Sequence, residues 1–371
     1  DRQRTSIAVG EGLVLPSALP LRLAAAGRLA VGQRMNVRLF DPSTLAPRDV
    51  ELKITAHDTI LVADTAVWDP GRGEWVGVPD TLPAWRIEET FGGVSVTSWV
   101  DEDGRLIRAE SPLGFTLERT AYEIAQAEWQ RAREDRTLAQ GYGTVIEGTA
   151  IAANAQLGAA GSIDRLAVRL LDVDLEGFDL SGGRQELRGD TLFVTREVLA
   201  GGAGYALPYR GGGPVAEELA ATPLVQADDP RIVEAAKRIA GDERDPAAVA
   251  RLLNDWVYAN VRKDITLSVP SAVQVLEAMT GDCNEHTVLY VALARSLGLP
   301  TRTAVGLVHI DGRFYYHAWP EVWLDGRWVA VDPTLGQFPA DASHLRFLIG
   351  GLARQVELVR LIGRLRLEPV L

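Results

Sequence analysis

The sequence is poor in the residues on which several protein classes depend. Its 371 residues include one cysteine, Cys283. A single cysteine excludes an internal disulfide framework and any zinc or iron–sulfur site built from several thiolates. No apolar run reaches the ~18 residues typical of a membrane-spanning helix. The net charge of −12 argues against a nucleic-acid-binding protein, because a phosphate backbone requires a clustered positive surface.

The remaining composition is that of a folded globular chain. Hydrophobic residues make up 47% and charged residues 24% of the sequence, which argues against disorder or a fibrous repeat. At ~150 residues per domain, a chain of this length predicts two or three domains. Each of them is long enough to bury a core of its own.

The first half of the chain has the short, turn-bounded runs of a β-rich domain. Asp103-Gly104 lies between two such runs and predicts a hairpin. A helix is expected at about 121–133, where apolar residues recur at helical spacing. This half shows no catalytic cluster, so we interpret residues 1–212 as a β-rich accessory domain. The expected strands are 35–40, 50–55, 85–89, 94–100, 106–110, 166–173 and 191–198.

A loop-rich stretch follows the β-rich half, and the sequence after it has the pattern of helices. Glycines and prolines gather between residues 201 and 227, so we expect a linker at 213–227 and a catalytic domain at 228–371. Asp229-Pro230 and Asp245-Pro246 each place a capping carboxylate before a proline, which predicts two helix starts. A capping-box pattern at 271–274 and an amphipathic run at 284–297 predict two more helices.

After these helices the hydrophobic period changes to two. Residues 301–310, 314–324 and 327–331 read as three strands. Asp311-Gly312 and Asp325-Gly326 lie between them, and both are strong hairpin signals. Helices followed by an antiparallel sheet predict an α+β fold for this half.

Three separated residues, Cys283, His317 and Asp332, have the chemistry of a nucleophilic site. Cys283 begins a predicted helix, whose N-terminus supplies partial positive charge that favours a thiolate over a thiol. A two-residue loop at 325–326 pairs Leu324 with Arg327, so Asp332 lies diagonal to His317 on one face of the sheet. A carboxylate there can fix the tautomer of the imidazole and stabilise its cation.

Three motifs resemble the core of the bacterial transglutaminase-like superfamily. They are Gly-Asp-Cys-Asn-Glu-His at 281–286, Tyr-His-Ala-Trp at 316–319 and Trp-Val-Ala-Val-Asp-Pro-Thr at 328–334. The resemblance covers about residues 228–350. It implies a papain-like acyl-transfer site, with Cys283 as nucleophile, His317 as general acid and base and Asp332 as the orienting partner of His317.

The resemblance implies an enzyme that acts on peptide or protein amides through a thioester. Water would resolve the thioester in a protease or amidase, and a primary amine would resolve it in a transglutaminase. The backbone N–H of Cys283 is one oxyanion donor. Mammalian transglutaminases use a tryptophan upstream of the cysteine as another, but Trp256 lies on an apolar helix face and reads as core. Neither a cofactor nor calcium is expected.

Three further residues are candidates for the substrate-binding wall. His286 shares a helix face with Cys283, and Tyr315 and Trp319 share the sheet face of His317. Plain sheet packing explains the two aromatic residues equally well. Three other histidines have no supporting partners in the sequence and are interpreted as structural: His57, His309 and His344.

Two other classes of function stay open. One is a non-catalytic scaffold or binding protein of the cell envelope that uses the same fold. The other is a metal-dependent hydrolase, in which Cys283, His286 and His317 hold the ion and Asp332 completes the set. The chain starts at Asp1 and carries a β-rich first half, which suits an exported, periplasmic protein with a possible membrane tether; a cytoplasmic location is the alternative. The oligomeric state is not predicted.

Overall fold

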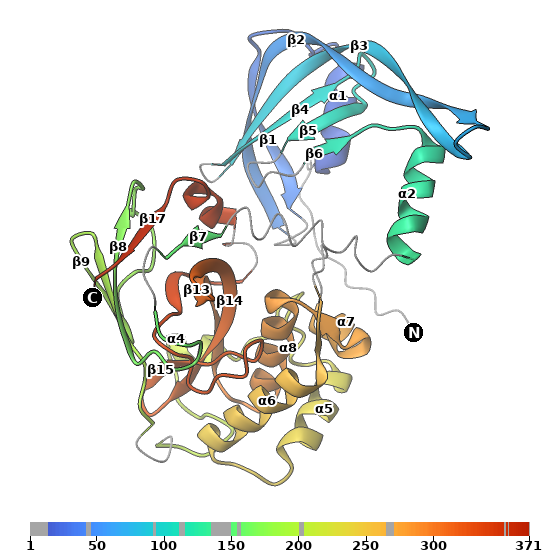
Figure 1. Cartoon of the computed structure of the whole chain (residues 1–371). Helices are drawn as coiled ribbons and strands as arrows, with labels where there is room; N and C mark the ends of the chain where they lie inside the picture. The colour runs from blue at the N-terminus through green and yellow to red at the C-terminus, as the bar shows by residue number, and fades with distance from the viewer. Residues whose placement is uncertain are drawn as a thin grey trace. The chain divides into compact units, whose positions relative to one another are not determined.

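A computed structural model of the chain divides into two compact units, residues 1–145 and 146–371. It describes residues 14–41, 46–91, 94–110, 116–134, 150–153, 157–199, 204–264, 271–351, 354 and 356–370. Figure 1 shows the path of the chain and the labels used below. Among the residues that the structure describes, no helix has the length and apolar character needed to cross a membrane.

The first unit is built on a six-stranded antiparallel sheet in which each strand pairs with the next. The predicted strands and helix are present, and β2 and β3 are much longer than expected because they form one extended hairpin. Apolar side chains of the sheet pack with Leu19 and Leu23 of a helix that the sequence analysis did not predict. The elements are η1 (Pro16–Ala18), α1 (Leu19–Ala25), β1 (Arg34–Asp41), β2 (Ala46–Asp69), β3 (Glu74–Phe91), β4 (Val94–Val100), β5 (Leu106–Glu110), β6 (Thr116–Glu118) and α2 (Tyr122–Glu134).

The helices of the second unit begin where the capping signals predict. Asp229 accepts a hydrogen bond from the backbone N–H of Arg231, and Asp245 accepts one from that of Ala248. Proline occupies the first turn of both helices, where its missing N–H costs nothing. The helices are α4 (Pro214–Glu217), α5 (Pro230–Ala240), α6 (Pro246–Asn260), α7 (Ala272–Ala278) and α8 (Cys283–Ser296).

An antiparallel sheet follows the helices, in the order β15-β14-β13-β16, with β7 pairing to β14. Both predicted hairpins are present: Asp311 and Gly312, like Asp325 and Gly326, have positive φ angles, as a type I′ turn requires. Fold class is therefore as predicted, with helices first and the sheet second. The strands are β7 (Ile151–Ala152), β11 (Arg262–Lys263), β12 (Thr280–Gly281), β13 (Thr301–Ile310), β14 (Arg313–Leu324), β15 (Arg327–Ala330) and β16 (Leu345–Ile349).

Helix α8 is the centre of this unit. Its residues 285–294 are all buried, because the helix packs against α5, α6 and α7 on one side and against β13 and β14 on the other. Thr287, one turn after Cys283, donates a hydrogen bond of 3.1 Å to the backbone oxygen of Ala318. This contact fixes the first turn of α8 beside the strand that carries His317.

The division between the two units lies earlier than the sequence predicted. Residues 146–212 belong with the second unit, where β8 and β10 form a sheet with a strand from the C-terminal end of the chain, β17 (Figure 1). Their apolar side chains share one core with Leu307 and Phe347. The segment 213–227 is not a free linker either, since the backbone oxygen of Leu224 accepts from Ala272. The remaining elements are β8 (Arg165–Leu171), β9 (Gln185–Arg188), β10 (Thr191–Thr195), η3 (Val356–Leu361) and β17 (Arg366–Pro369).

Candidate active site

Cys283 is the first residue of α8, and Asp282 caps that helix. The Asp282 carboxylate accepts the backbone N–H of Asn284 at 2.8 Å, and Glu285 accepts that of Asp282 at 2.9 Å, which completes a capping box. Cys283 is half-buried. The cap thus holds the thiol at the positive end of a helix dipole, in a position that a substrate can reach.

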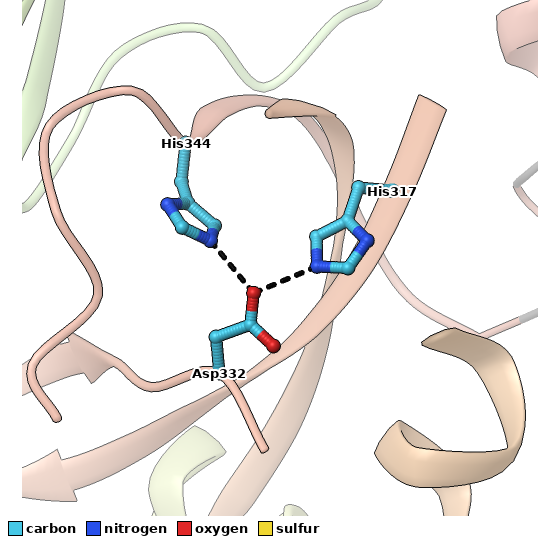
Figure 2. A group of neighbouring side chains, drawn as sticks. All are labelled: His317, Asp332 and His344. Atoms are coloured by element: carbon cyan, nitrogen blue, oxygen red, sulfur yellow. Dashed lines mark hydrogen bonds and ion pairs between the residues drawn. The ribbon is translucent and has the colours of Figure 1, made fainter. Parts of the chain in front are cut away.

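The predicted strand register is confirmed. Leu324 pairs with Arg327 and Glu321 with Ala330, so β15 ends two residues before Asp332. The carboxylate then meets the imidazole across the sheet: His317 Nε2 lies 2.8 Å from Asp332 Oδ2 (Figure 2). Both side chains are almost fully shielded from solvent.

The thiol of Cys283 also interacts with the His317 imidazole, because it is among the groups that raise the pKa of this ring. Because Nε2 faces Asp332, Nδ1 is the ring nitrogen left for the sulfur. Burial alone would lower the pKa of His317, but the facing Asp332 and Cys283 together raise it to about 9. The cationic form of the imidazole is thus favoured at neutral pH.

Asp332 has a second imidazole on the same oxygen. His344 Nε2 lies 2.9 Å from Asp332 Oδ2, so this oxygen sits between two rings (Figure 2). The other oxygen, Oδ1, accepts the backbone N–H groups of Thr334 and Leu335 at 2.7 and 2.9 Å. Burial would raise the pKa of Asp332, but the two imidazoles hold it well below its usual range.

The sequence analysis did not identify His344 as part of this site. The local sequence does not predict this role. His344 lies in a loop twelve residues after Asp332, and the residues around it form no hydrophobic period and no motif. Its ring meets Asp332 only once the loop 331–344 has folded back to place β16 beside β13. The interpretation of His344 as an isolated structural residue is corrected here.

The carboxyl groups of Asp282 and Glu285 lie close together beside Cys283. Burial and the neighbouring Glu285 carboxyl raise the pKa of Asp282 to about 8, since two carboxyls in contact cannot both ionise easily. This pair therefore carries less negative charge at neutral pH than two free carboxylates would.

Two residues predicted to line the substrate site are buried instead. His286 is 0% exposed, and its ring nitrogens face the backbone oxygens of Asp282 and Val261 at 2.7 and 3.2 Å. Trp319 is also 0% exposed and packs among small alanine side chains of the sheet. Neither side chain can contact a substrate in this structure, so both are corrected to structural roles; Tyr315 is half-buried and stays a candidate. Trp319 shares the face of β14 with His317, and its ring centroid lies 6.0 Å from that of His317 and 5.2 Å from that of His344. A strand or helix period predicts the face of a residue but not whether neighbouring side chains cover it.

Within the described residues, the group with the spacing of a metal site is His317, Asp332 and His344, whose donor atoms all lie within 4.8 Å of one another. It differs from the predicted set of Cys283, His286 and His317. The Nε2–Oδ2 separations of 2.8 and 2.9 Å are those of hydrogen bonds.

A cavity of about 550 Å³ lies elsewhere on the second unit, at the ends of α5 and α8. It is lined by apolar residues and by Lys237, Glu243, Arg244 and Arg295. None of Cys283, His317 and Asp332 reaches it, so it does not belong to the site described above.

Comparisons with known proteins show what this chain is similar to. The transglutaminase-like superfamily model matches residues 233–333, the span that contains Cys283, His317 and Asp332. Residues 233–333 are a transglutaminase-like core. The β-rich first unit and the sheet of β8–β10 lie outside this core.

Two further comparisons report likeness over part of the chain. An uncharacterized protein of Haemophilus influenzae is 31% identical over 98 residues, which cover 25% of this chain and 26% of that protein. The chain thus spans about a quarter of the length of this curated relative.

Among solved structures, a proposed cysteine protease from Cytophaga hutchinsonii aligns with a TM-score of 0.39 and 15% identity, over 56% of this chain and 83% of that one. The periplasmic domain of TgpA from Pseudomonas aeruginosa, bound to ethylmercury, aligns with a TM-score of 0.31 and 15% identity, over 52% and 84% of the two chains.

Proposed function

We propose that this protein is a cysteine-nucleophile acyl-transfer enzyme that acts on peptide or protein amides. The observation that carries the proposal is the position of His317 between two groups of opposite role. Its Nε2 lies 2.8 Å from the Asp332 carboxylate, and the Cys283 thiol at the start of α8 interacts with the same ring and raises its pKa. A thiolate, an imidazolium and an orienting carboxylate in this order are the parts of a nucleophilic triad.

Acylation follows from these positions. The Cys283 thiolate attacks the amide carbonyl carbon and forms a tetrahedral oxyanion. The capping box occupies the second and third amides of α8, which leaves the N–H of Cys283 to donate to this oxyanion. The imidazolium of His317 then gives its proton to the departing nitrogen, the carbon–nitrogen bond breaks, and a thioester remains.

Deacylation uses the same groups in reverse. Neutral His317 takes a proton from water or from a primary amine, which attacks the thioester carbonyl. The carbon–sulfur bond breaks, and the Cys283 thiolate and the His317 imidazolium form again. Water gives hydrolysis and an amine gives transamidation; we favour hydrolysis as the main reaction. A periplasmic location is proposed with it, as the sequence analysis expects.

Intact-mass spectrometry tests the proposal. A glutamine-containing model protein is incubated with the full chain and a labelled primary amine, with Cys283→Ala as the control. Adducts that depend on Cys283 establish transamidation, whereas cleavage fragments or one-dalton deamidation shifts without adducts establish hydrolysis.

Two outcomes would overturn the proposal. Identical spectra for the wild type and Cys283→Ala over a wide substrate panel would favour the non-catalytic scaffold. Activity that survives in Cys283→Ala would show that the thiol is not the nucleophile. Activity that a chelator abolishes and added zinc restores would favour a metal-dependent hydrolase. We expect dialysis against a chelator to leave the activity unchanged.

A further inference from the structure

The ring of His344 is fully buried, and both of its nitrogens face oxygen atoms. Nε2 lies 2.9 Å from Asp332 Oδ2. Nδ1 lies 3.2 Å from the backbone oxygen of Asp341 and 3.4 Å from its carboxylate oxygen Oδ1. A neutral imidazole has one N–H and one lone pair, so one nitrogen would point its lone pair at an oxygen. Only the doubly protonated ring donates on both sides.

The surroundings of His344 supply the countercharge that a buried cation needs. Asp332 and Asp341 flank the ring, and neither is exposed to solvent. Two positive groups also face this region: His317, whose ring centroid lies 5.8 Å away, and Arg184. Arg184 is paired with Glu197 at 3.5 Å. A cation between two buried carboxylates is stabilised where an isolated one would not be.

We propose that His344 is a positioning residue, held as an imidazolium between Asp332 and Asp341, that extends the line Cys283–His317–Asp332. The inference rests on the proposed function, since it assigns a role in that reaction. With His344 in place, all the acceptor positions of Asp332 that face the site are occupied, and the carboxylate cannot turn away from His317. The positive charge of His344 also offsets part of the pull of Asp332 on the His317 proton, so His317 releases that proton more readily to a leaving group.

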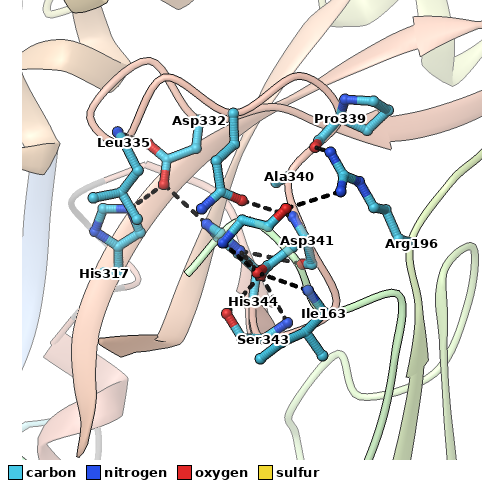
Figure 3. Close-up of polar contacts among 12 residues, drawn as sticks. Ile163, Arg196, His317, Asp332, Leu335, Pro339, Ala340, Asp341, Ser343 and His344 are labelled. Atoms are coloured by element: carbon cyan, nitrogen blue, oxygen red, sulfur yellow. Dashed lines mark hydrogen bonds and ion pairs between the residues drawn. The ribbon is translucent and has the colours of Figure 1, made fainter. Parts of the chain in front are cut away.

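The far end of this line is anchored by a segment outside the transglutaminase-like core. Asp341 Oδ2 accepts the backbone N–H of Gly161 at 2.7 Å and that of Ile163 at 3.4 Å. Arg184 donates to the backbone oxygens of Ala340 and Asp341 at 3.0 and 2.6 Å. Figure 3 shows Asp341 beside Ile163, Ser343 and His344, with Arg196 bound to Pro339 nearby. The residues before and within the β8–β10 sheet thus fix the loop that presents His344.

Alkylation of the thiol by iodoacetamide tests the proposal without a substrate, because Cys283 is the only cysteine. The rate is measured against pH in the wild type, His344→Gln, His344→Ala and the control His309→Gln, which replaces another buried histidine of the same unit. In the wild type, the alkylation rate should change in a step near pH 9, where His317 loses its proton. Both His344 variants should move this step upward by about one pH unit, since they remove a like charge 5.8 Å from His317.

Turnover separates the charge of His344 from its hydrogen bond. The amide of His344→Gln can still donate to Asp332, whereas His344→Ala leaves that oxygen with one partner fewer. We expect kcat to fall by roughly 10- to 100-fold in His344→Ala, by analogy with the loss of a hydrogen-bond partner that orients a histidine in a metal site. His344→Gln should fall less, with KM unchanged in both variants. The proposal would be overturned if both variants keep the wild-type kcat and if the step in their alkylation rate stays at the wild-type pH.

A second measurement keeps the test informative if the variants do not fold. Nitrogen-15 NMR of histidine-labelled wild-type protein at pH 8 reports the protonation of each ring nitrogen. Two protonated nitrogens on His344 support the proposal, and one bare nitrogen overturns it. If these results hold while no amide substrate reacts, the proposed function fails and the charged state of His344 stands by itself.

Discussion

At the scale of single residues, the site depends on how each imidazole nitrogen is occupied. His317 Nε2 faces the Asp332 carboxylate, so the ring cannot flip without losing this hydrogen bond. His286 is equally buried but meets only backbone oxygens, and burial lowers its pKa. Two histidines close to one thiol thus have opposite preferences for charge, because only one of them faces a carboxylate.

The raised pKa of His317 predicts a pH-dependent stability. A group whose pKa rises on folding contributes stability that is complete below its unfolded pKa of 6.5 and is lost as pH rises through about 9. The difference corresponds to about 3 kcal/mol at most. We expect the free energy of unfolding in urea to fall by an amount of this order between pH 6.5 and pH 10.

His317→Gln provides the comparison, because it removes the titrating group and leaves the other groups that titrate in this range, Asp282 among them. Its free energy of unfolding should fall less over the same interval. Equal pH dependence in the two proteins would mean that His317 is not charged in the folded state.

At the scale of elements, helix α8 and strands β13, β14 and β16 bring the site together. The helix carries Cys283, β14 carries His317, and His344 directly precedes β16. The backbone of β16 lies very close to that of β13 at Gly306, where the register of the two paired strands shifts. A Cβ atom at Gly306 would lie 1.9 Å from the backbone oxygen of Leu345. Glycine is required here because no side chain fits between the two backbones.

Gly306→Ala should therefore push β16 away from β13 and displace His344 with it. We expect a loss of about 1–3 kcal/mol in the free energy of unfolding, the usual size for overpacking, together with a lower kcat. Urea unfolding and turnover with a peptide substrate measure the two effects. Gly212→Ala is the matched control, since a Cβ there meets no atom within 4 Å. Wild-type stability in Gly306→Ala would show that β16 does not depend on this approach.

At the scale of the whole molecule, each unit has hydrophobic cores of its own. The clusters around Leu52 and around Ile107 contain only residues of the first unit. The clusters around Leu289, Phe347 and Trp319 contain only residues of the second unit. The sheet of β8–β10 and β17 contributes one wall of the core around Phe347, so the second unit needs it to cover apolar surface.

Two fragments distinguish the observed division from the predicted one. Residues 146–371 keep every cluster of the second unit and should unfold cooperatively as a monodisperse protein. Residues 213–371 lack β8–β10, expose the partners of Leu166 and Leu192, and lose the contacts of Arg184 with Asp341. Thermal melts followed by circular dichroism, with gel filtration, should show aggregation or no cooperative transition for the shorter fragment. Equal folding of both fragments would place the division at 213–227 after all.

Features that depend on nearby residues could be derived from the sequence alone. The caps at Asp229, Asp245 and Asp282 are local hydrogen bonds, and the two hairpins follow from Asp-Gly pairs that accept positive φ. Because a two-residue turn fixes the register beyond it, the meeting of His317 with Asp332 was predictable as well. The core from residue 228 onward was predictable for the same reason: its signals lie within a few residues of the structures that they specify.

The tertiary structure alone decided what depends on residues far apart in the chain. Gly161 and Asp341 are 180 residues apart, and Gln185 meets Arg346 across 161 residues, so no period or motif connects them. The same holds for the place of β17 beside β8, for the burial of His286 and Trp319, and for the contact of His344 with Asp332. Each of these results from apolar surfaces and buried polar groups that find partners only when distant segments pack together.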